Sequence, residues 1–239
     1  MKKLTILLLL TVCKLSFAQG DQKSPRNAVL TINELIPHGW KLIAKARGDL
    51  NKDGLVDLAL VIENTNRKNF ISNAGGLGTD TLNTNPRGLL VAFKQPNGTY
   101  QLVTKNTSFI PPPNAPDSPC LLDPFGEEGS IEISKGLLKI NFQHFYSCGG
   151  WETYNFEYIF RYQHQKFELI GYNKSSMNRA SGEETQITVN FSTLKLNRTS
   201  GSNAFGRDSK PKTSWERFKL KKLFELSTIH QDSLDRFNF

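Results

Sequence analysis

Alternation between apolar and polar residues runs along most of this sequence and points to a chain built mainly from β-strands. In the segment "TYNFEYIFRY", residues 153–162, every second residue is aromatic. Because the side chains of a strand point alternately to its two faces, this segment predicts a strand with one aromatic face. Aromatic side chains bury large areas, so we interpret this face as the core side of a sheet; a platform for stacking sugars is the alternative. The aromatic face comprises Tyr154, Phe156, Tyr158, Phe160 and Tyr162, and the opposite face comprises Trp151, Thr153, Asn155, Glu157 and Arg161.

Short turns join several of these alternating segments. Asn97-Gly98 in "QPNGTY" and Gly136 in "SKGL" are typical of tight hairpin turns, and "QHQK" at 163–166 is a short polar connection. Strands that follow one another through such turns form an antiparallel meander. The sequence therefore predicts a mainly β fold, either sandwich-like or a partial propeller-like sheet. The expected strands are Lys41–Arg47, Val56–Glu63, Leu89–Lys94, Thr99–Lys105, Ser130–Ile133, Leu137–His144, Thr153–Tyr162, Phe167–Asn173, Thr185–Phe191 and Thr193–Asn197.

A short helix is expected before the strands, over residues 24–36, "SPRNAVLTINELI". Ser24 is a favoured capping residue, and Pro25 suits the first helical position because the N–H group it lacks has no partner there. The run Pro37-His38-Gly39 is a helix-ending signal.

The N-terminus has the three parts of a secretory signal peptide. Two lysines precede an apolar run from Leu4 to Val12, and Ser16-Phe17-Ala18 is a small-x-small cleavage site. A membrane-spanning helix needs about 20 apolar residues, and Lys14 ends this run earlier; a retained N-terminal anchor is the alternative. We therefore expect residues 1–18 to be removed, leaving Gln19 as the first residue of a periplasmic or secreted protein with no membrane span.

The net charge gives little indication of a partner. The chain carries 30 basic and 22 acidic residues, a formal charge of +8. Removal of the three lysines of the leader leaves 27 against 22, or +5, spread along the chain. The densest basic stretch, "KLKKLF" at 219–224, is too short for a nucleic-acid-binding stripe. We expect no nucleic-acid partner. The expected partner is either an unknown ligand or a molecule of the cell envelope or the extracellular space.

Two cysteines, Cys120 and Cys148, remain once the leader is removed. An even pair in an oxidising compartment predicts a disulfide. In the chain-entropy model, closing this loop should stabilise the fold by roughly 3–4 kcal/mol. The competing interpretation is a reactive thiol, but neither cysteine belongs to a Cys-x-x-Cys motif. His144 stands four residues before Cys148, in an alternating segment where this offset repeats the face without contact.

Changes in composition divide the chain into parts. Residues 19–198 form the expected β domain, interrupted by long polar loops at 64–88 and 110–129; loops this long in compact domains are usually functional or disordered. Residues 199–212 are polar and are interpreted as a linker. Residues 213–239 form a C-terminal segment that is expected to pack on the β domain. Its apolar residues include Trp215, Phe218, Leu220, Leu223 and Phe224.

The segment "ARGDLNKDGLVDLALVIE", residues 46–63, carries the one pattern in the sequence that specifies a chemistry. Calcium takes six to eight oxygen ligands, and a flexible loop supplies them compactly from alternate positions. Gly54 follows the fifth position, where the chain must turn sharply in a backbone conformation that favours glycine. We expect bound Ca²⁺ here; an Asx-rich turn without a metal is the alternative. The predicted ligands are the side chains of Asp49, Asn51, Asp53 and Asp57 and the backbone carbonyl of Leu55.

This loop is not an EF-hand, because Leu60 stands at the twelfth position, where a bidentate glutamate is required, and its flanks are strands. The stretch "GDLNKDGLVDLALV" resembles the calcium loop DxNxDGxxDL of the integrin-like FG-GAP and VCBS-type repeats. The resemblance implies the same five ligands and a strand after the loop. It covers about 18 of the 239 residues, and the motif occurs once. Since a propeller needs several blades, the propeller is not carried over, and the chain is more similar to exported bacterial proteins with a lone motif of this kind.

No catalytic residues are predicted. The four histidines form no metal-binding spacing, and no nucleophile motif is present in a suitable setting. The carboxylates Asp123, Glu127 and Glu128 lie in the second long loop, and such groups can serve glycoside hydrolysis, but a solvated loop is the simpler interpretation. We predict a non-enzymatic, exported calcium-binding β protein in which calcium stabilises the fold and supports a ligand- or partner-binding surface. The alternative is a cell-envelope hydrolase with a structural calcium and an active site in loops 64–88 and 110–129.

Overall fold

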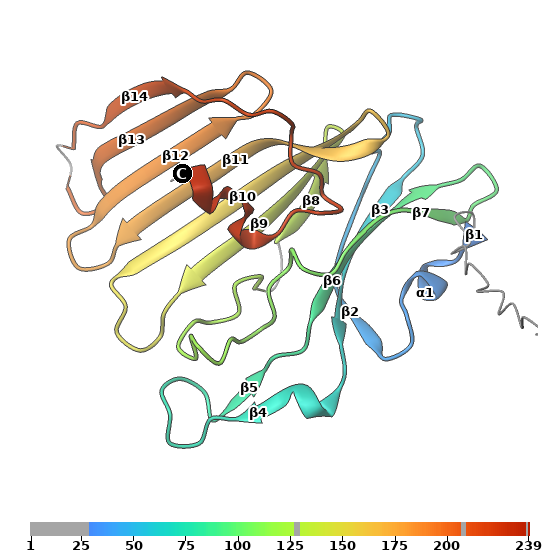
Figure 1. Cartoon of the computed structure of the whole chain (residues 1–239), viewed down its shortest axis with the longest axis horizontal. Coiled ribbons are helices and arrows are strands. Elements are labelled where there is room, and N and C mark those ends of the chain that lie inside the picture. Colours follow the sequence, from blue (N-terminus) through green and yellow to red (C-terminus); the bar gives the residue numbers. More distant parts are fainter. Residues whose placement is uncertain (1–28, 127–129, 207–208, 238) are drawn as a thin grey trace, which may run out of the picture.

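The computed structural model describes residues 29–126, 130–206, 209–237 and 239. The expected signal peptide, residues 1–18, lies outside the described residues. The predicted fold class is confirmed: the chain is mainly β, with two antiparallel sheets whose facing sides enclose the larger core (Figure 1). No helix in the described part of the chain is long and apolar enough to cross a membrane.

The first sheet has five strands in the order β1-β7-β6-β3-β2. Its two central strands, β3 and β6, are buried on both faces, since one face meets the second sheet and the other is covered by the helix α1 (Ile32–Leu35). Burial on both faces explains why "DLALVI" and "GLLVAF" read as nearly continuous apolar runs. The strands are β1 (Val29–Leu30), β2 (Trp40–Gly48), β3 (Asp57–Asn64), β6 (Arg87–Lys94) and β7 (Tyr100–Asn106).

The N-terminal helix is present but shorter than expected. Val29–Leu30 form β1 and pair with β7, so α1 begins only at Ile32. Thr31 precedes it, and its backbone N–H donates to the Glu34 carboxylate at 2.6 Å, which is half of a capping box. The helix ends before Pro37, because a residue preceding proline disfavours helical backbone. The expected start at Ser24 and Pro25 lies outside the described residues.

The second sheet is a meander of seven strands, β8 to β14 in chain order. Its two tightest turns, Lys135-Gly136 and His164-Gln165, have positive φ at both residues, as two-residue hairpins require. Every strand expected from the sequence is present in one of the two sheets, with shifted ends. The strands of this sheet are β8 (Ile131–Ser134), β9 (Leu137–Phe145), β10 (Glu152–Gln163), β11 (Lys166–Asn178), β12 (Glu183–Asn190), β13 (Lys195–Asn203) and β14 (Lys212–Arg217).

The aromatic face of β10 is the core side of this sheet, as predicted. Tyr158 and Phe160 are buried, and their rings lie 5.0 and 5.8 Å from the ring of Phe109. The facing side of the first sheet contributes Val61 and Val91, among others, to the same core. The C-terminal residues cover a further part of this face of the seven-stranded sheet (Figure 1). They include Leu226, Ile229, Leu234 and Phe239.

The expected linker at 199–212 is wrong at both ends. Thr199–Asn203 complete β13, and Lys212 begins β14, which pairs with β13 from Ser200↔Lys212 to Lys195↔Arg217. The segment looked like a linker because most of its residues are polar. An edge strand with a solvated face needs no apolar alternation.

The two long loops are tied to the sheets. The first contains the 3₁₀ turn η1 (Arg67–Asn69) and the small hairpin β4 (Phe70–Ser72) and β5 (Thr81–Asn83), which projects from the sandwich (Figure 1). The second contains Cys120, which forms the predicted disulfide with Cys148. A second 3₁₀ segment, η2 (Gln231–Phe237), lies near the C-terminus.

Candidate functional site

The predicted calcium loop, residues 49–57, consists of the connection from β2 to β3 and the first residue of β3. Lys52 and Gly54 take positive φ values of 66° and 86°, which let the loop reverse direction twice in a few residues. The loop lies against the β8–β9 turn: a Cβ added at Gly136 would be 3.4 Å from Lys52 Cε and 3.7 Å from the Asp49 carbonyl oxygen. The loop therefore sits where a hairpin of one sheet meets a hairpin of the other.

Backbone amides hold the acidic side chains of the loop in place. Asp49 Oδ1 accepts from the N–H groups of Lys52 and Asp53 at 2.6 and 3.2 Å, and Oδ2 accepts from that of Gly54 at 2.9 Å. Asp53 Oδ1 accepts from Leu55 N–H, and its Oδ2 from the Asn51 side-chain amide, both at 2.8 Å. Asn51 Oδ1 accepts from Asp53 N–H at 3.1 Å. Asp49, Asn51 and Asp53 are thus brought together as the network of Asx turns that the sequence left as the alternative.

Asp57 occupies a different environment. Its side chain is fully buried, and its carboxylate accepts from Leu50 N–H at 2.8 Å and from Lys94 N–H at 2.9 Å. Burial raises the pKa of Asp57 and the nearby charge of Asp53 raises it further, against the lowering effect of the amide hydrogen bonds. Asp57 consequently connects the loop to β6 and is sensitive to the charge of Asp53.

The side chains of the loop offer oxygen atoms, which are the ligands that a hard cation such as calcium takes. Each carboxylate offers about four lone-pair sites, and the hydrogen bonds above use three on Asp49 and two on Asp53. No ion pair among the described residues includes Asp49, Asp53 or Asp57. The described residues also contain no group of three or more acidic, histidine or cysteine side chains gathered for a metal. The carboxylates are therefore directed to loop amides, and ion binding would exchange some of these bonds for metal–oxygen bonds.

The two long loops meet at a buried ion network rather than at an exposed acid pair. Arg87 is 5% exposed; its Nε donates to Glu63 at 2.9 Å, and its two terminal nitrogens donate to both oxygens of Asp123 at 2.6 Å. Burial raises the pKa of Glu63, but hydrogen bonds from Lys41, Asn83 and Arg87 outweigh that effect and hold it below its usual value. Carboxylates that are bound by an arginine in this way hold the loops in place. Glu127 and Glu128, the other acids considered for hydrolysis, lie outside the described residues.

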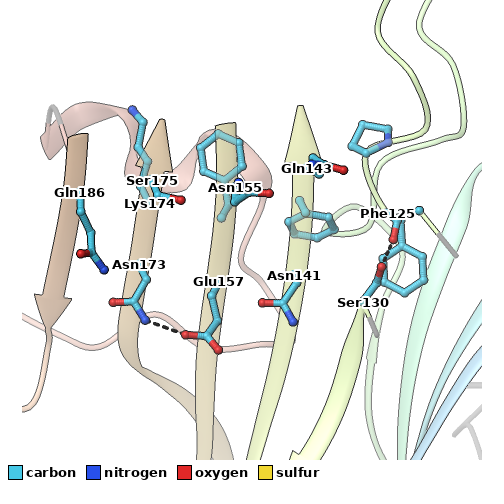
Figure 2. A pocket seen from close by; sticks show the side chains of 14 residues that line it. Phe125, Ser130, Asn141, Gln143, Asn155, Glu157, Asn173, Lys174, Ser175 and Gln186 are labelled. Atoms are coloured by element: carbon cyan, nitrogen blue, oxygen red, sulfur yellow. Dashed lines mark hydrogen bonds between the residues drawn. The ribbon is translucent and has the colours of Figure 1, made fainter. Parts of the chain in front are cut away.

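A second candidate site lies on the outer face of the seven-stranded sheet, opposite the core. Strand register aligns polar side chains there into two rows that cross the strands, and we refer to the two rows together as the polar face. Figure 2 shows the part of the two rows that lies on β9 to β12. The first row is Asn141, Glu157, Asn173, Thr188, Asn197 and Trp215. The second row is Gln143, Asn155, Ser175, Gln186, Thr199 and Thr213.

The polar face is hollowed. One hollow of about 390 Å³ lies between the two rows and the segment Pro124–Gly126, which forms a wall beside β9. Within it, Glu157 accepts a hydrogen bond from the Asn173 amide at 2.6 Å (Figure 2). Lys139 Nζ lies 4.0 Å from the same carboxylate. The sequence placed Asn155 and Glu157 on a non-aromatic face, but the rows depend on pairing between six strands, which no local pattern reports.

Comparison of the chain with protein-family models, with curated proteins and with solved structures finds no match. The resemblance of the loop to FG-GAP and VCBS-type repeats thus rests on residues 46–63 alone.

Proposed function

We propose that this chain is an exported, non-enzymatic calcium-binding β protein in which the ion stabilises the fold and which also carries a ligand- or partner-binding surface. Calcium would be held by Asp49, Asn51, Asp53, the carbonyl of Leu55 and Asp57. The observation that supports this function best is the position of the loop. The loop contacts the β8–β9 turn through Asp49 and Lys52, and its carboxylates have no basic partner among the described residues.

A divalent cation would relieve the repulsion in this loop. The charge of Asp53 already raises the pKa of the buried Asp57, so neutralising Asp53 favours the ionised form of Asp57. In binding the ion, the Asn51 side chain would turn its oxygen inward, because its amide nitrogen now donates to Asp53. Since oxygen ligands in an adaptable loop suit calcium better than the strict octahedron of magnesium, calcium is the expected ion.

A non-enzymatic role is supported by the state of the acidic side chains outside the loop. Asp123 is bound by Arg87 through both oxygens, and the pKa of Glu63 is lowered, whereas a general acid needs a raised pKa. Export is supported by the leader-like N-terminus and by the disulfide, which persists in oxidising compartments.

Calorimetric titration of calcium into the chelator-stripped protein tests this function. We expect one ion per chain, with a Kd of roughly 10⁻⁴–10⁻³ M or tighter, as in extracellular calcium modules. Asp53→Ala should abolish the binding heat. Asn97→Ala is the matched control, because the Asn97 side chain accepts hydrogen bonds within its own turn, from the N–H and hydroxyl of Thr99. A wild-type protein that gives no binding heat at millimolar calcium would leave the loop as an Asx turn.

A further inference from the structure

We propose that the polar face binds an uncharged, hydroxyl-rich carbohydrate chain that lies across the strands of the seven-stranded sheet. Such a ligand would occupy the ligand-binding surface of the function proposed above, on which this inference rests. Its binding does not require calcium, because the calcium loop belongs to the connection between β2 and β3, at the opposite side of β8 from the rows.

The shape of the face suits an elongated ligand. The first hollow of about 390 Å³ shares Gln143, Asn155, Ser175 and Gln186 with a second hollow of about 560 Å³. The second hollow extends to Thr199 and Ser202 on β13. Because they share lining residues, the two hollows form one path from the Pro124–Gly126 wall across the strands from β9 to β13. A path of this kind is open along its length and suits a polymer better than a compact molecule.

The charge of the face favours an uncharged ligand. Glu157 is the only charged side chain among the twelve of the two rows, whereas charged residues make up 22% of the chain. Around the rows, the first two hollows add one acidic and two basic groups. The two basic groups are engaged: Lys174 Nζ donates to the Phe239 carbonyl oxygen and Arg179 donates to the Tyr146 carbonyl oxygen. An uncharged ligand is therefore the charge-complementary one. The acidic group is Glu184.

The chemistry of the rows matches that of sugar hydroxyls. The side chains of Asn, Gln, Ser and Thr each donate and accept hydrogen bonds, as a sugar hydroxyl does, whereas lysine only donates and a carboxylate only accepts. Neutral amides and hydroxyls also lose less solvation free energy on binding than charged groups do. Adjacent strands place these groups about 4.8 Å apart along a row, so a ligand that crosses the strands meets a new polar group at each strand.

Exposed tryptophans complete the face. Trp215 ends the first row on the edge strand β14 and is 68% exposed; Trp151, at the start of β10, is 64% exposed. Aromatic rings that have one solvent-exposed side are enriched at binding surfaces, and a flat ring can stack on the C–H face of a sugar. These two tryptophans are among the most exposed large apolar side chains of the described residues.

Affinity electrophoresis of the full-length protein tests this inference. Native gels would contain one neutral polysaccharide each, namely laminarin, xylan, galactomannan or dextran, or the anionic alginate. We expect at least one neutral polysaccharide to retard the wild type. Trp215→Ala and the double variant Asn155→Ala/Gln186→Ala should each weaken that retardation at least tenfold. Leu77→Ala removes an equally exposed apolar side chain from the loop between β4 and β5 and should leave retardation unchanged.

Three outcomes would overturn the inference: no neutral polysaccharide retards the protein, alginate alone does, or both row variants bind like the wild type with unchanged melting temperatures. Repeating the gels in calcium and in chelator separates this result from the calcium proposal. Retardation in both conditions without any calcium-induced rise in melting temperature supports the carbohydrate site and refutes the metal. A calcium-induced rise in melting temperature without retardation supports the metal and refutes the carbohydrate site.

Discussion

Arg87 holds both long loops against the five-stranded sheet, and Arg87→Met tests how much that network contributes. Arg87 and Glu63 have side chains 5% and 3% exposed, and the variant leaves the buried Glu63 without its guanidinium partner. Removing one partner of a buried ion pair destabilises by about 3–5 kcal/mol. We expect a loss of about 3 kcal/mol, the lower end of that range, because Lys41 stays 3.0 Å from Glu63 and Asp123 is 34% exposed.

The loss should depend on pH. The folded-state pKa of Glu63 is lowered below its usual 4.5, so its contribution is fully present above that value and is lost as pH falls through the folded-state pKa. Urea unfolding followed by circular dichroism should show the full difference from the wild type at neutral pH and a smaller one in acid. Arg161→Met, which removes an exposed arginine from β10, should stay within about 0.5 kcal/mol of the wild type. An Arg87→Met loss below about 1 kcal/mol, or one equal at both pH values, would refute the reasoning.

Other substitutions test the remaining supports of the fold. Cys120→Ser combined with Cys148→Ser should lower the free energy of unfolding by about 3.6 kcal/mol, the loop-closure value for a separation of 28 residues; non-reducing urea denaturation measures it, and an unchanged midpoint contradicts it. Phe160→Ala should lose about 3–5 kcal/mol, because the ring is fully buried. By the same assay Phe205→Ala, at a site 66% exposed, should change stability by less than about 0.5 kcal/mol. Gly54→Ala should lose about 1–2 kcal/mol from strain alone, because φ is +86° and no atom lies within 4 Å of the added Cβ; an unchanged stability in chelator would contradict this.

Much of the sheet structure can be predicted from the sequence because alternation is a local signal. The aromatic face of β10 is core because its register brings Tyr158 and Phe160 over the facing sheet. The edge strand β14 is exposed along its whole length and shows no alternation, so only its pairing with β13 reveals it. The start of α1 is displaced because Val29–Leu30 gain sheet hydrogen bonds with β7, which local helix signals do not report.

The two candidate sites also differ in how far they can be predicted from the sequence. The acidic loop is contiguous in sequence, so its residues are found by spacing, although spacing does not show that Asp57 turns toward Leu50 and Lys94. The ion network joins Arg87 to Asp123 across 36 residues, and the polar face joins six strands. Both depend on register and loop path, which only the folded chain defines.

Thermal unfolding of the wild type in calcium and in chelator tests the calcium-stabilised fold most directly. An ion that binds the folded chain and not the unfolded one adds RT ln(1 + [L]/Kd), or about 2.7 kcal/mol at a hundredfold excess over Kd. For a domain of this size, that corresponds to a rise in melting temperature of roughly 5–11 °C. Asp53→Ala should abolish the rise, Asn97→Ala should keep it, and magnesium should reproduce little of it. Identical melting of the wild type in calcium and in chelator would contradict the account.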